Sequence, residues 1–175
     1  RLVLLGFEPS EPETEYGYIL PDGTDGSPFG IHRVEKFVEK PDSTAARKLI
    51  LQRGLWNSMV MVFKIRTLLE VVRRQAPELY AYCRRILRAI GTRSEPEVVE
   101  EVYRNMRPLN FSRELLATLP GISPLSLAVL PAHGVYWSDW GLPHCVQRVL
   151  KKIGHPAQLH SPDAMGKNRL FKLMD

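Results

Sequence analysis

The alternation of apolar and polar residues predicts a chain of short strands and amphipathic helices. Apolar runs near the start are typical of strands buried in a parallel sheet, whereas the segment from His32 to Glu39 alternates in polarity as a half-buried strand does. Pro41 cannot continue a ladder of hydrogen bonds and marks the end of that strand. The predicted strands span residues 2–7, 16–20, 32–39, 59–63, 125–130 and 134–137.

Apolar residues at three- and four-residue spacing predict the helices. Asp42 precedes the first helix, which we expect to run to Arg53 and to stop at Gly54. Ser94 and Glu97 match a capping box at the start of a later helix. The predicted helical segments are 43–53, 68–72, 79–90, 98–106 and 143–153.

Strands that alternate with helices indicate an α/β fold, here with a helical segment inserted in it. The 175 residues suit one domain or a large part of one, and the apolar content of 44% is enough for a sizeable core. Cys83 lies on an apolar helical stripe, so we expect a buried, unpaired thiol. The sequence has no internal repeat and no segment of low complexity.

The formal net charge of +5 favours anionic partners such as nucleotides or sugar phosphates. The basic residues are dispersed over predicted helices, which indicates a solvated surface and argues against nucleic acid. No run of about 18 apolar residues predicts a membrane span, and no signal-like segment opens the chain. A cytoplasmic location is therefore the default expectation, and a homo-oligomer is left open.

A carboxylate lies between two indoles in Trp137-Ser138-Asp139-Trp140-Gly141. On one interpretation these residues form a tight turn in which Asp139 caps the following helix. On the other, Asp139 holds a metal ion. Taken alone, the segment fits both interpretations.

Three earlier segments, followed by the one around Asp139, form an ordered series over about 130 residues of the sequence. They are 12–19 (Pro-Glu-Thr-Glu-Tyr-Gly-Tyr-Ile), 37–41 (Phe-Val-Glu-Lys-Pro) and 55–58 (Leu-Trp-Asn-Ser). In this order the four segments resemble the second half of the sugar-1-phosphate nucleotidyltransferases, and most of all the mannose-1-phosphate guanylyltransferases. The resemblance implies a Rossmann-like nucleotide-diphospho-sugar transferase fold, with a mixed sheet and flanking helices.

The resemblance also implies an activity and a cofactor. Such an enzyme transfers a nucleotidyl group from a nucleoside triphosphate, here GTP, to a sugar 1-phosphate, here mannose 1-phosphate, with Mg²⁺ as cofactor. Asp139 matches the second of two family aspartates that share the metal, which makes it a catalytic and metal-binding residue. Lys40 matches a catalytic lysine and has the point charge that suits a phosphate group.

Four more residues match positions that bind the sugar phosphate in the family. Glu39 and Glu13 would accept hydrogen bonds from sugar hydroxyls, and the Asn57 amide could both donate and accept. Gly17 would let the backbone approach the sugar closely. We expect Glu39, Lys40 and Asn57 to converge, with Glu13 and Asp139, on one concave surface at the carboxyl ends of the strands.

Several departures from the family pattern limit what the resemblance implies. Glu15 and Met59 stand where the family has glycine, and the sequence lacks the glycine-rich nucleotide loop and the first metal-binding aspartate. Residues 1–175 are therefore expected to be the sugar-phosphate-binding part of a catalytic domain without its nucleotide-binding part, inactive alone and with an open strand edge. The alternative is a non-catalytic relative that senses a nucleotide sugar or regulates another subunit.

Overall fold

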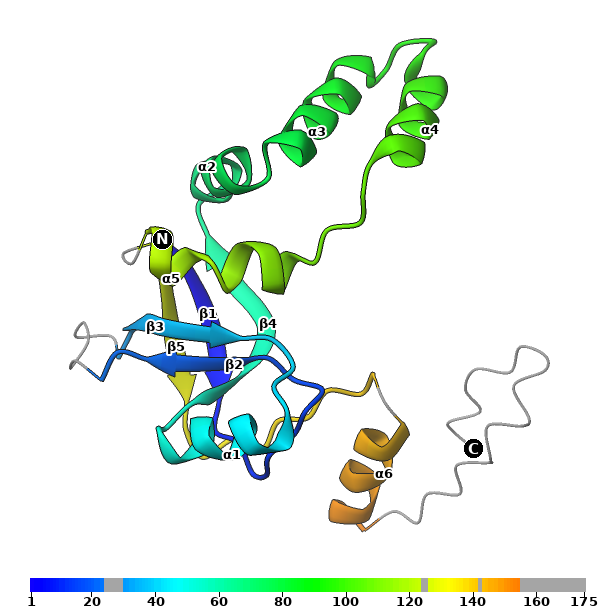
Figure 1. Cartoon of the computed structure of the whole chain (residues 1–175). Coiled ribbons are helices and arrows are strands. Elements are labelled where there is room, and N and C mark those ends of the chain that lie inside the picture. Colours follow the sequence, from blue (N-terminus) through cyan, green and yellow to red (C-terminus); the bar gives the residue numbers. More distant parts are fainter. Residues whose placement is uncertain (24–29, 124–125, 142, 155–175) are drawn as a thin grey trace. The chain divides into compact units, whose positions relative to one another are not determined.

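The computed structural model has the α/β architecture that the sequence predicts (Figure 1). It describes residues 1–23, 30–123, 126–141 and 143–154. These fall into two units, Arg1–Val135 and Tyr136–Asp175, each of which is described by itself. The strands, all in the first unit, are β1 (Leu2–Phe7), β2 (Tyr18–Pro21), β3 (His32–Val38), β4 (Leu55–Phe63) and β5 (Leu127–Ala132). The helices of that unit are α1 (Ser43–Leu51), α2 (Ile65–Gln75), α3 (Pro77–Ala89), α4 (Glu95–Asn105), the π-helical turn η1 (Ser112–Leu116) and α5 (Leu119–Ile122).

The five strands pair in a ring in the order β1-β4-β2-β3-β5. Only the β1–β5 pair is parallel, and the other four pairs are antiparallel. A short pairing of His32 with Val129 and of Arg33 with Ala128 closes the ring between β3 and β5. The open strand edge expected from the sequence is thus wrong for the described strands, because each one has a neighbour on both sides.

A bulge in β4 is the main irregularity of the ring. Leu4 of β1 is opposite Met61, but Gly6 is opposite Asn57, so β4 has extra residues between these two pairs. The Ser58 hydroxyl donates to the Leu5 carbonyl at 2.6 Å and accepts from the Val60 amide at 3.2 Å. The side chain of Ser58 thereby replaces backbone hydrogen bonds that the bulge interrupts.

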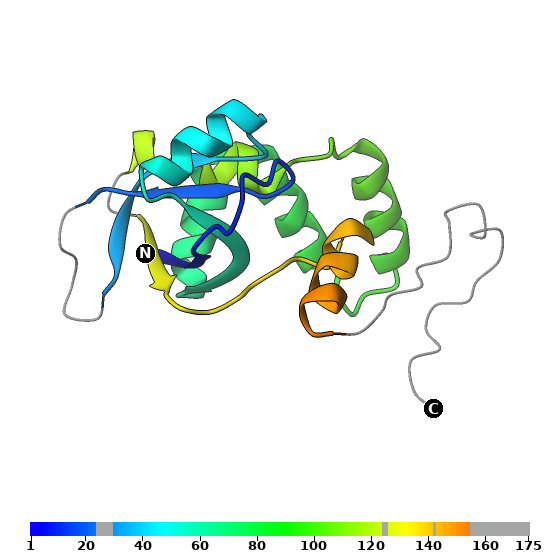
Figure 2. The ribbon, with the colours of Figure 1, turned by 90° about the horizontal axis from the view of Figure 1, so that it is seen from below.

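The hydrophobic core lies against the ring and is completed by helical residues. Leu2 and Leu4 of β1 have no exposed surface, and neither has Leu116 of η1. Helix α1 lies beside β2 in both views (Figures 1 and 2). The buried core residues are Leu2, Leu4, Ile19, Val34, Phe37, Leu55, Val71, Ala76, Leu115, Leu116, Leu119, Leu127 and Val129.

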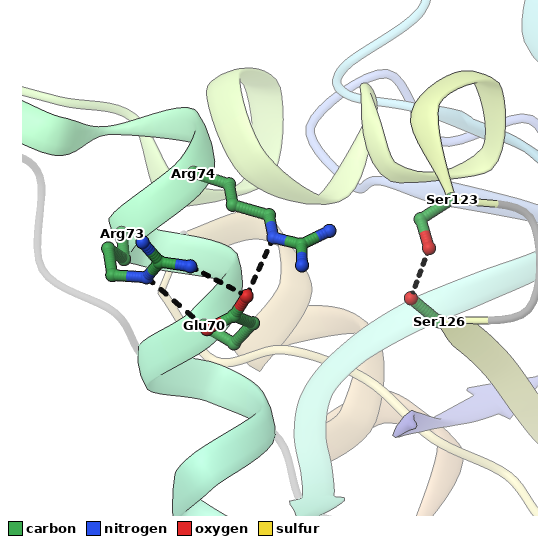
Figure 3. A network of polar contacts seen from close by, with 5 residues as sticks. All are labelled: Glu70, Arg73, Arg74, Ser123 and Ser126. Carbon is green, nitrogen blue, oxygen red and sulfur yellow. Dashed lines mark hydrogen bonds and ion pairs between the residues drawn. The ribbon is translucent and has the colours of Figure 1, made fainter.

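Helices α2, α3 and α4 follow β4 and form the inserted helical segment that the sequence predicts (Figure 1). Helix α3 packs against both α2 and α4. On the polar side of α2, Glu70 accepts hydrogen bonds from Arg73 at 2.9 Å and Arg74 at 2.7 Å (Figure 3). Ala89 is the buried residue of α3, whereas Cys83 is exposed, so the prediction of a buried thiol is wrong.

The pattern at 59–63 does not give the buried strand that was predicted. Strand β4 begins earlier, at Leu55, and its second half exposes Met59, Val60 and Val62. The reason is the bulge, which shifts the alternation of the strand. Asn57 lies within this strand.

The two predicted helix caps differ in outcome. Asp42 caps α1, since its carboxylate accepts a hydrogen bond from the Ala45 amide at 2.7 Å. The capping box at α4 is wrong: among the described residues, no side-chain hydrogen bond joins Ser94 to that helix, and its hydroxyl lies 3.0 Å from that of Thr92. The carboxylate of Glu95 instead accepts from the Gly91 amide at 2.7 Å.

This difference gives a test of the capping assignment. We expect Asp42→Ala to lower the free energy of unfolding by about 1 kcal/mol, because it removes an acceptor from the first turn of α1. Ser94→Ala is the matched control and should change it by less than about 0.5 kcal/mol. Urea denaturation followed by circular dichroism measures both. Equal losses in the two variants would contradict the assignment.

The second unit contains one described helix, α6 (Pro143–Lys152), close to the predicted bounds. The Lys152 ammonium lies 3.5 Å from the centre of the Tyr136 ring, a cation–π contact within this unit. The strand predicted at 134–137 is wrong, because Gly134 has a φ of 67° and the chain turns there. Among the described residues, no helix has the length and apolar content needed to cross a membrane.

Candidate functional site

Three of the predicted site residues meet where β2 begins and β3 ends. The backbone amide of Asn57 in β4 donates to the Gly17 carbonyl at 2.8 Å. A Cβ atom on Gly17 would lie 3.0 Å from the Glu39 carboxylate, 3.1 Å from the Phe37 ring and 3.4 Å from the Asn57 Cβ. Gly17, Glu39 and Asn57 therefore form one cluster, and only glycine at position 17 leaves room for it.

The pairing of the strands explains this meeting. Tyr18 of β2 is opposite Trp56 of β4 on one side and Val38 of β3 on the other. Because β2 is antiparallel to both neighbours, the start of β2 lies beside the end of β3. Glu39 and Lys40 follow β3 directly. These two residues therefore lie at the carboxyl end of a strand, as expected.

Glu13 is buried and organises the turn that leads into β2. Its carboxylate accepts hydrogen bonds from the Thr14 amide at 3.0 Å and from the Glu15 amide at 3.4 Å. The Tyr18 hydroxyl donates to the Glu13 carbonyl at 3.0 Å, and burial raises the pKa of Tyr18. These contacts position the loop in front of the cluster, so part of the role of Glu13 is structural.

Lys40 lies beside the cluster in a left-handed conformation, with a φ of 47°. Its ammonium contacts the Glu15 carboxylate at 3.0 Å, and both side chains are about half exposed. The hydrogen bond to Glu15 and its charge raise the pKa of Lys40, with a further contribution from the charge of Glu39. The contact with Glu15 thus favours the charged form of the ammonium.

Asn57 is buried, and its amide contacts the side chain of Met59. Its Nδ2 donates to the Met59 sulfur at 2.9 Å, and its Oδ1 accepts from the Met59 backbone amide at 3.2 Å. Met59 has a φ of 59°, in the left-handed region that glycine adopts most readily. Position 59, where the family pattern has glycine, therefore has a left-handed backbone in this protein although methionine occupies it.

Arg113 is a cation near the site that the sequence did not indicate. The hydroxyl of its neighbour Ser112 donates to the Met59 sulfur at 3.4 Å, which places the start of η1 beside the cluster. The charge of Arg113 opposes the rise in the pKa of Lys40. Phe111, Leu115 and Leu119 have the four-residue spacing of a helix, but no motif marks Arg113 as part of a site.

Asp139 belongs to the second unit and lies in a tight turn. Its Oδ1 accepts from the Gly141 amide at 3.0 Å, and a Cβ atom on Gly141 would lie 3.2 Å from its Oδ2. Asp139 is exposed. The turn agrees with one interpretation of this segment, and the metal-binding role stays a prediction.

Several curated bacterial proteins are similar to about half of this chain. The chain is 39% identical to the alginate biosynthesis protein AlgA of Pseudomonas aeruginosa over 84 residues, which are 47% of this chain and 18% of AlgA. It is 33% identical to the mannose-1-phosphate guanylyltransferase ManC of Salmonella typhimurium over 96 residues, 51% of this chain and 19% of ManC. The chain thus spans less than a fifth of the length of these curated relatives.

Two solved structures share the fold and confirm the fold class predicted from the sequence. One is described as a mannose-1-phosphate geranyltransferase from Thermus thermophilus, with a TM-score of 0.59 and 30% identity; the match covers 74% of this chain and 34% of that one. The other is described as a mannose-6-phosphate isomerase from Helicobacter pylori, with a TM-score of 0.60 and 23% identity, over 79% and 51% of the two chains. The family model described as "Nucleotidyl transferase" matches residues 1–153, and the chain belongs to that family.

Proposed function

We propose that this chain is the sugar-phosphate-binding part of an enzyme that transfers a nucleotidyl group from GTP to mannose 1-phosphate. The observation that carries the proposal is the meeting of Gly17, Glu39 and Asn57 beside Lys40, in a chain of the nucleotidyl transferase family. The choice of mannose and GTP is supported by the names of relatives such as the mannose-1-phosphate guanylyltransferase ManC.

The reaction explains why such a site needs positioning and charge more than a general base. An oxygen of the sugar phosphate attacks the α-phosphorus of the triphosphate and forms a new P–O bond. The bond from that phosphorus to the bridging oxygen breaks, and pyrophosphate leaves with the electron pair. Since the nucleophile is already an anion, the protein must mainly overcome repulsion between two polyanions and align them.

The residues of the cluster suit the sugar-phosphate side of this reaction. In the proposed complex, Lys40 contacts the phosphate as a point charge, while Glu39 accepts hydrogen bonds from sugar hydroxyls. The Asn57 side chain offers a donor and an acceptor to the same ligand. Gly17 leaves space at the cluster, and Glu13 both fixes the loop and offers its carboxylate to the sugar.

The carboxylate of Asp139 is a type of ligand that suits Mg²⁺. Magnesium takes oxygen ligands, commonly one or two carboxylates together with substrate phosphates, and the carboxylate of Asp139 lies at the protein surface, held by Gly141. When bound, the ion would neutralise charge on the phosphates. Asp139 would hold the ion at the position of this turn.

The 175-residue chain itself provides the first test. We expect calorimetric titration to detect weak binding of mannose 1-phosphate, with a dissociation constant on the order of 1 mM. Lys40→Met should weaken it because the phosphate loses its cation. Lys48→Met, which removes an exposed cation of α1, is the matched control and should bind normally.

A pyrophosphate-release assay completes this test. The chain alone should release none with any nucleoside triphosphate, because its sequence has no glycine-rich loop to hold the phosphates. Robust release would show that the catalytic groups are misplaced in the proposal. Equal binding by the two lysine variants would remove Lys40 from the site.

A second candidate function is supported by the contacts of Glu15 and Met59. These side chains already engage Lys40 and Asn57, which would suit a regulatory relative that senses a nucleotide sugar without turnover. The product of the complete gene discriminates between the two functions. Release of pyrophosphate from GTP and mannose 1-phosphate supports the enzyme, whereas binding of GDP-mannose without release supports the sensor.

A further inference from the structure

Two side chains of this protein already contact polar groups of the proposed ligand site. The Glu15 carboxylate lies 3.0 Å from the Lys40 ammonium, and the Met59 sulfur accepts a hydrogen bond from the Asn57 amide. A ligand that uses either group must compete with a contact inside the protein. The affinity of the site therefore depends on these contacts as well as on the groups that bind.

Glu15 is the stronger competitor, because its carboxylate offers Lys40 the same kind of contact as a phosphate oxygen. Both are anionic acceptors for an ammonium donor. Glu15 and Lys40 are about half exposed, so their ion pair is weak enough to be displaced. A displaced Glu15 stays attached to a loop that Glu13 holds in place, so it remains near Lys40 and keeps competing for it.

We propose that Glu15 lowers the affinity of the site for phosphate groups by competing for Lys40. This inference rests on the proposed function, since it takes Lys40 as the phosphate-binding group. Lys40 is assigned this role because it follows directly after Glu39, a member of the cluster. With a neutral side chain at position 15, the same site binds a phosphate monoester more tightly.

Titration of the 175-residue chain with mannose 1-phosphate and with inorganic phosphate tests the inference. Glu15→Gln keeps the size of the side chain and removes its charge, and it should tighten the binding of both probes about fivefold. Glu70→Gln is the matched control, because Glu70 is also an exposed carboxylate paired with cations, on α2 (Figure 3). It should leave both affinities unchanged.

Two further measurements separate competition from a general effect of charge. In a Lys40→Met background, Glu15→Gln should give no gain in affinity, because the contested cation is gone. Nuclear magnetic resonance of the lysine side chains should show a lower pKa for Lys40 in the Glu15→Gln variant, which reports the ion pair without any ligand.

The outcomes distinguish this inference from the proposed function. If the wild-type chain binds mannose 1-phosphate and Glu15→Gln binds it no more tightly, the competition is refuted and the proposed site stands. A gain that persists without Lys40, or that Glu70→Gln reproduces, also refutes it. If none of the variants binds either probe, the phosphate site itself is wrong, and the inference falls with it.

Discussion

Asp139→Asn in the product of the complete gene should lower the rate of pyrophosphate release by about 100-fold or more and leave the fold intact. Asparagine keeps an oxygen that can accept from the Gly141 amide, so the turn is retained. It cannot supply the negative charge that holds Mg²⁺ beside two phosphates. Steady-state release of pyrophosphate, together with circular dichroism of the variant, measures both parts.

A neighbouring residue of the same turn is the control for this variant. The Ser138 hydroxyl donates only to the carbonyl of Asp139, at 3.2 Å, among the contacts of the described residues. Ser138→Ala should therefore change the rate little. Nearly normal turnover by a folded Asp139→Asn variant would remove Asp139 from the mechanism.

Leu116→Ala should cause the largest loss of stability among the substitutions considered, about 2–5 kcal/mol. Leu116 has no exposed surface and lies in η1, where it packs into the core of the ring. Its truncation leaves a cavity that rigid strands cannot fill. Guanidinium denaturation monitored by circular dichroism measures the change.

Leu51→Ala is the matched control, with the same chemical change at a residue that is 84% exposed. We expect it to alter the free energy of unfolding by less than about 0.5 kcal/mol. A similar small loss for Leu116→Ala would mean that η1 does not close the core in solution.

Elements with a clear local pattern could be predicted from the sequence. The strand from Leu2 to Phe7 is a continuous apolar run, and helix α1 has both an amphipathic face and the cap at Asp42. The structure confirms both. Local chemistry decides these elements, so a sequence window contains what is needed to identify them.

Elements decided by distant contacts could not be predicted in this way. The bulge of β4 depends on the Ser58 hydroxyl reaching the Leu5 carbonyl, which is 53 residues away in the chain. The capping box failed for a different reason, because Glu95 caps the turn at Gly91 from a neighbouring position. A distant contact thus overrides the local pattern in β4, whereas at α4 a nearby carboxylate outside the capping-box pattern makes the contact.

For the candidate site, residue matches were more informative than periodicity. Glu39 and Asn57 lie on different parts of the chain, and the family pattern led to the prediction that they share one surface; both lie next to Gly17, while the convergence with Asp139 stays a prediction. The contacts of Glu15 and Met59 could not be foreseen, since they arise where the sequence departs from that pattern. The family pattern has glycine at both positions, so it gives no information about where these side chains lie.

The single parallel pair of the ring bears on how the chain folds during synthesis. Leu2 pairs with Leu127, so β1 must wait during synthesis for a strand that follows it by 125 residues. Until β5 has emerged, one edge of β1 has no neighbour, and the apolar side chains of Leu2 and Leu4 lack part of their cover. Contacts so distant along the chain form slowly, and the waiting strand is where a nascent chain of this protein would be most exposed to misassembly.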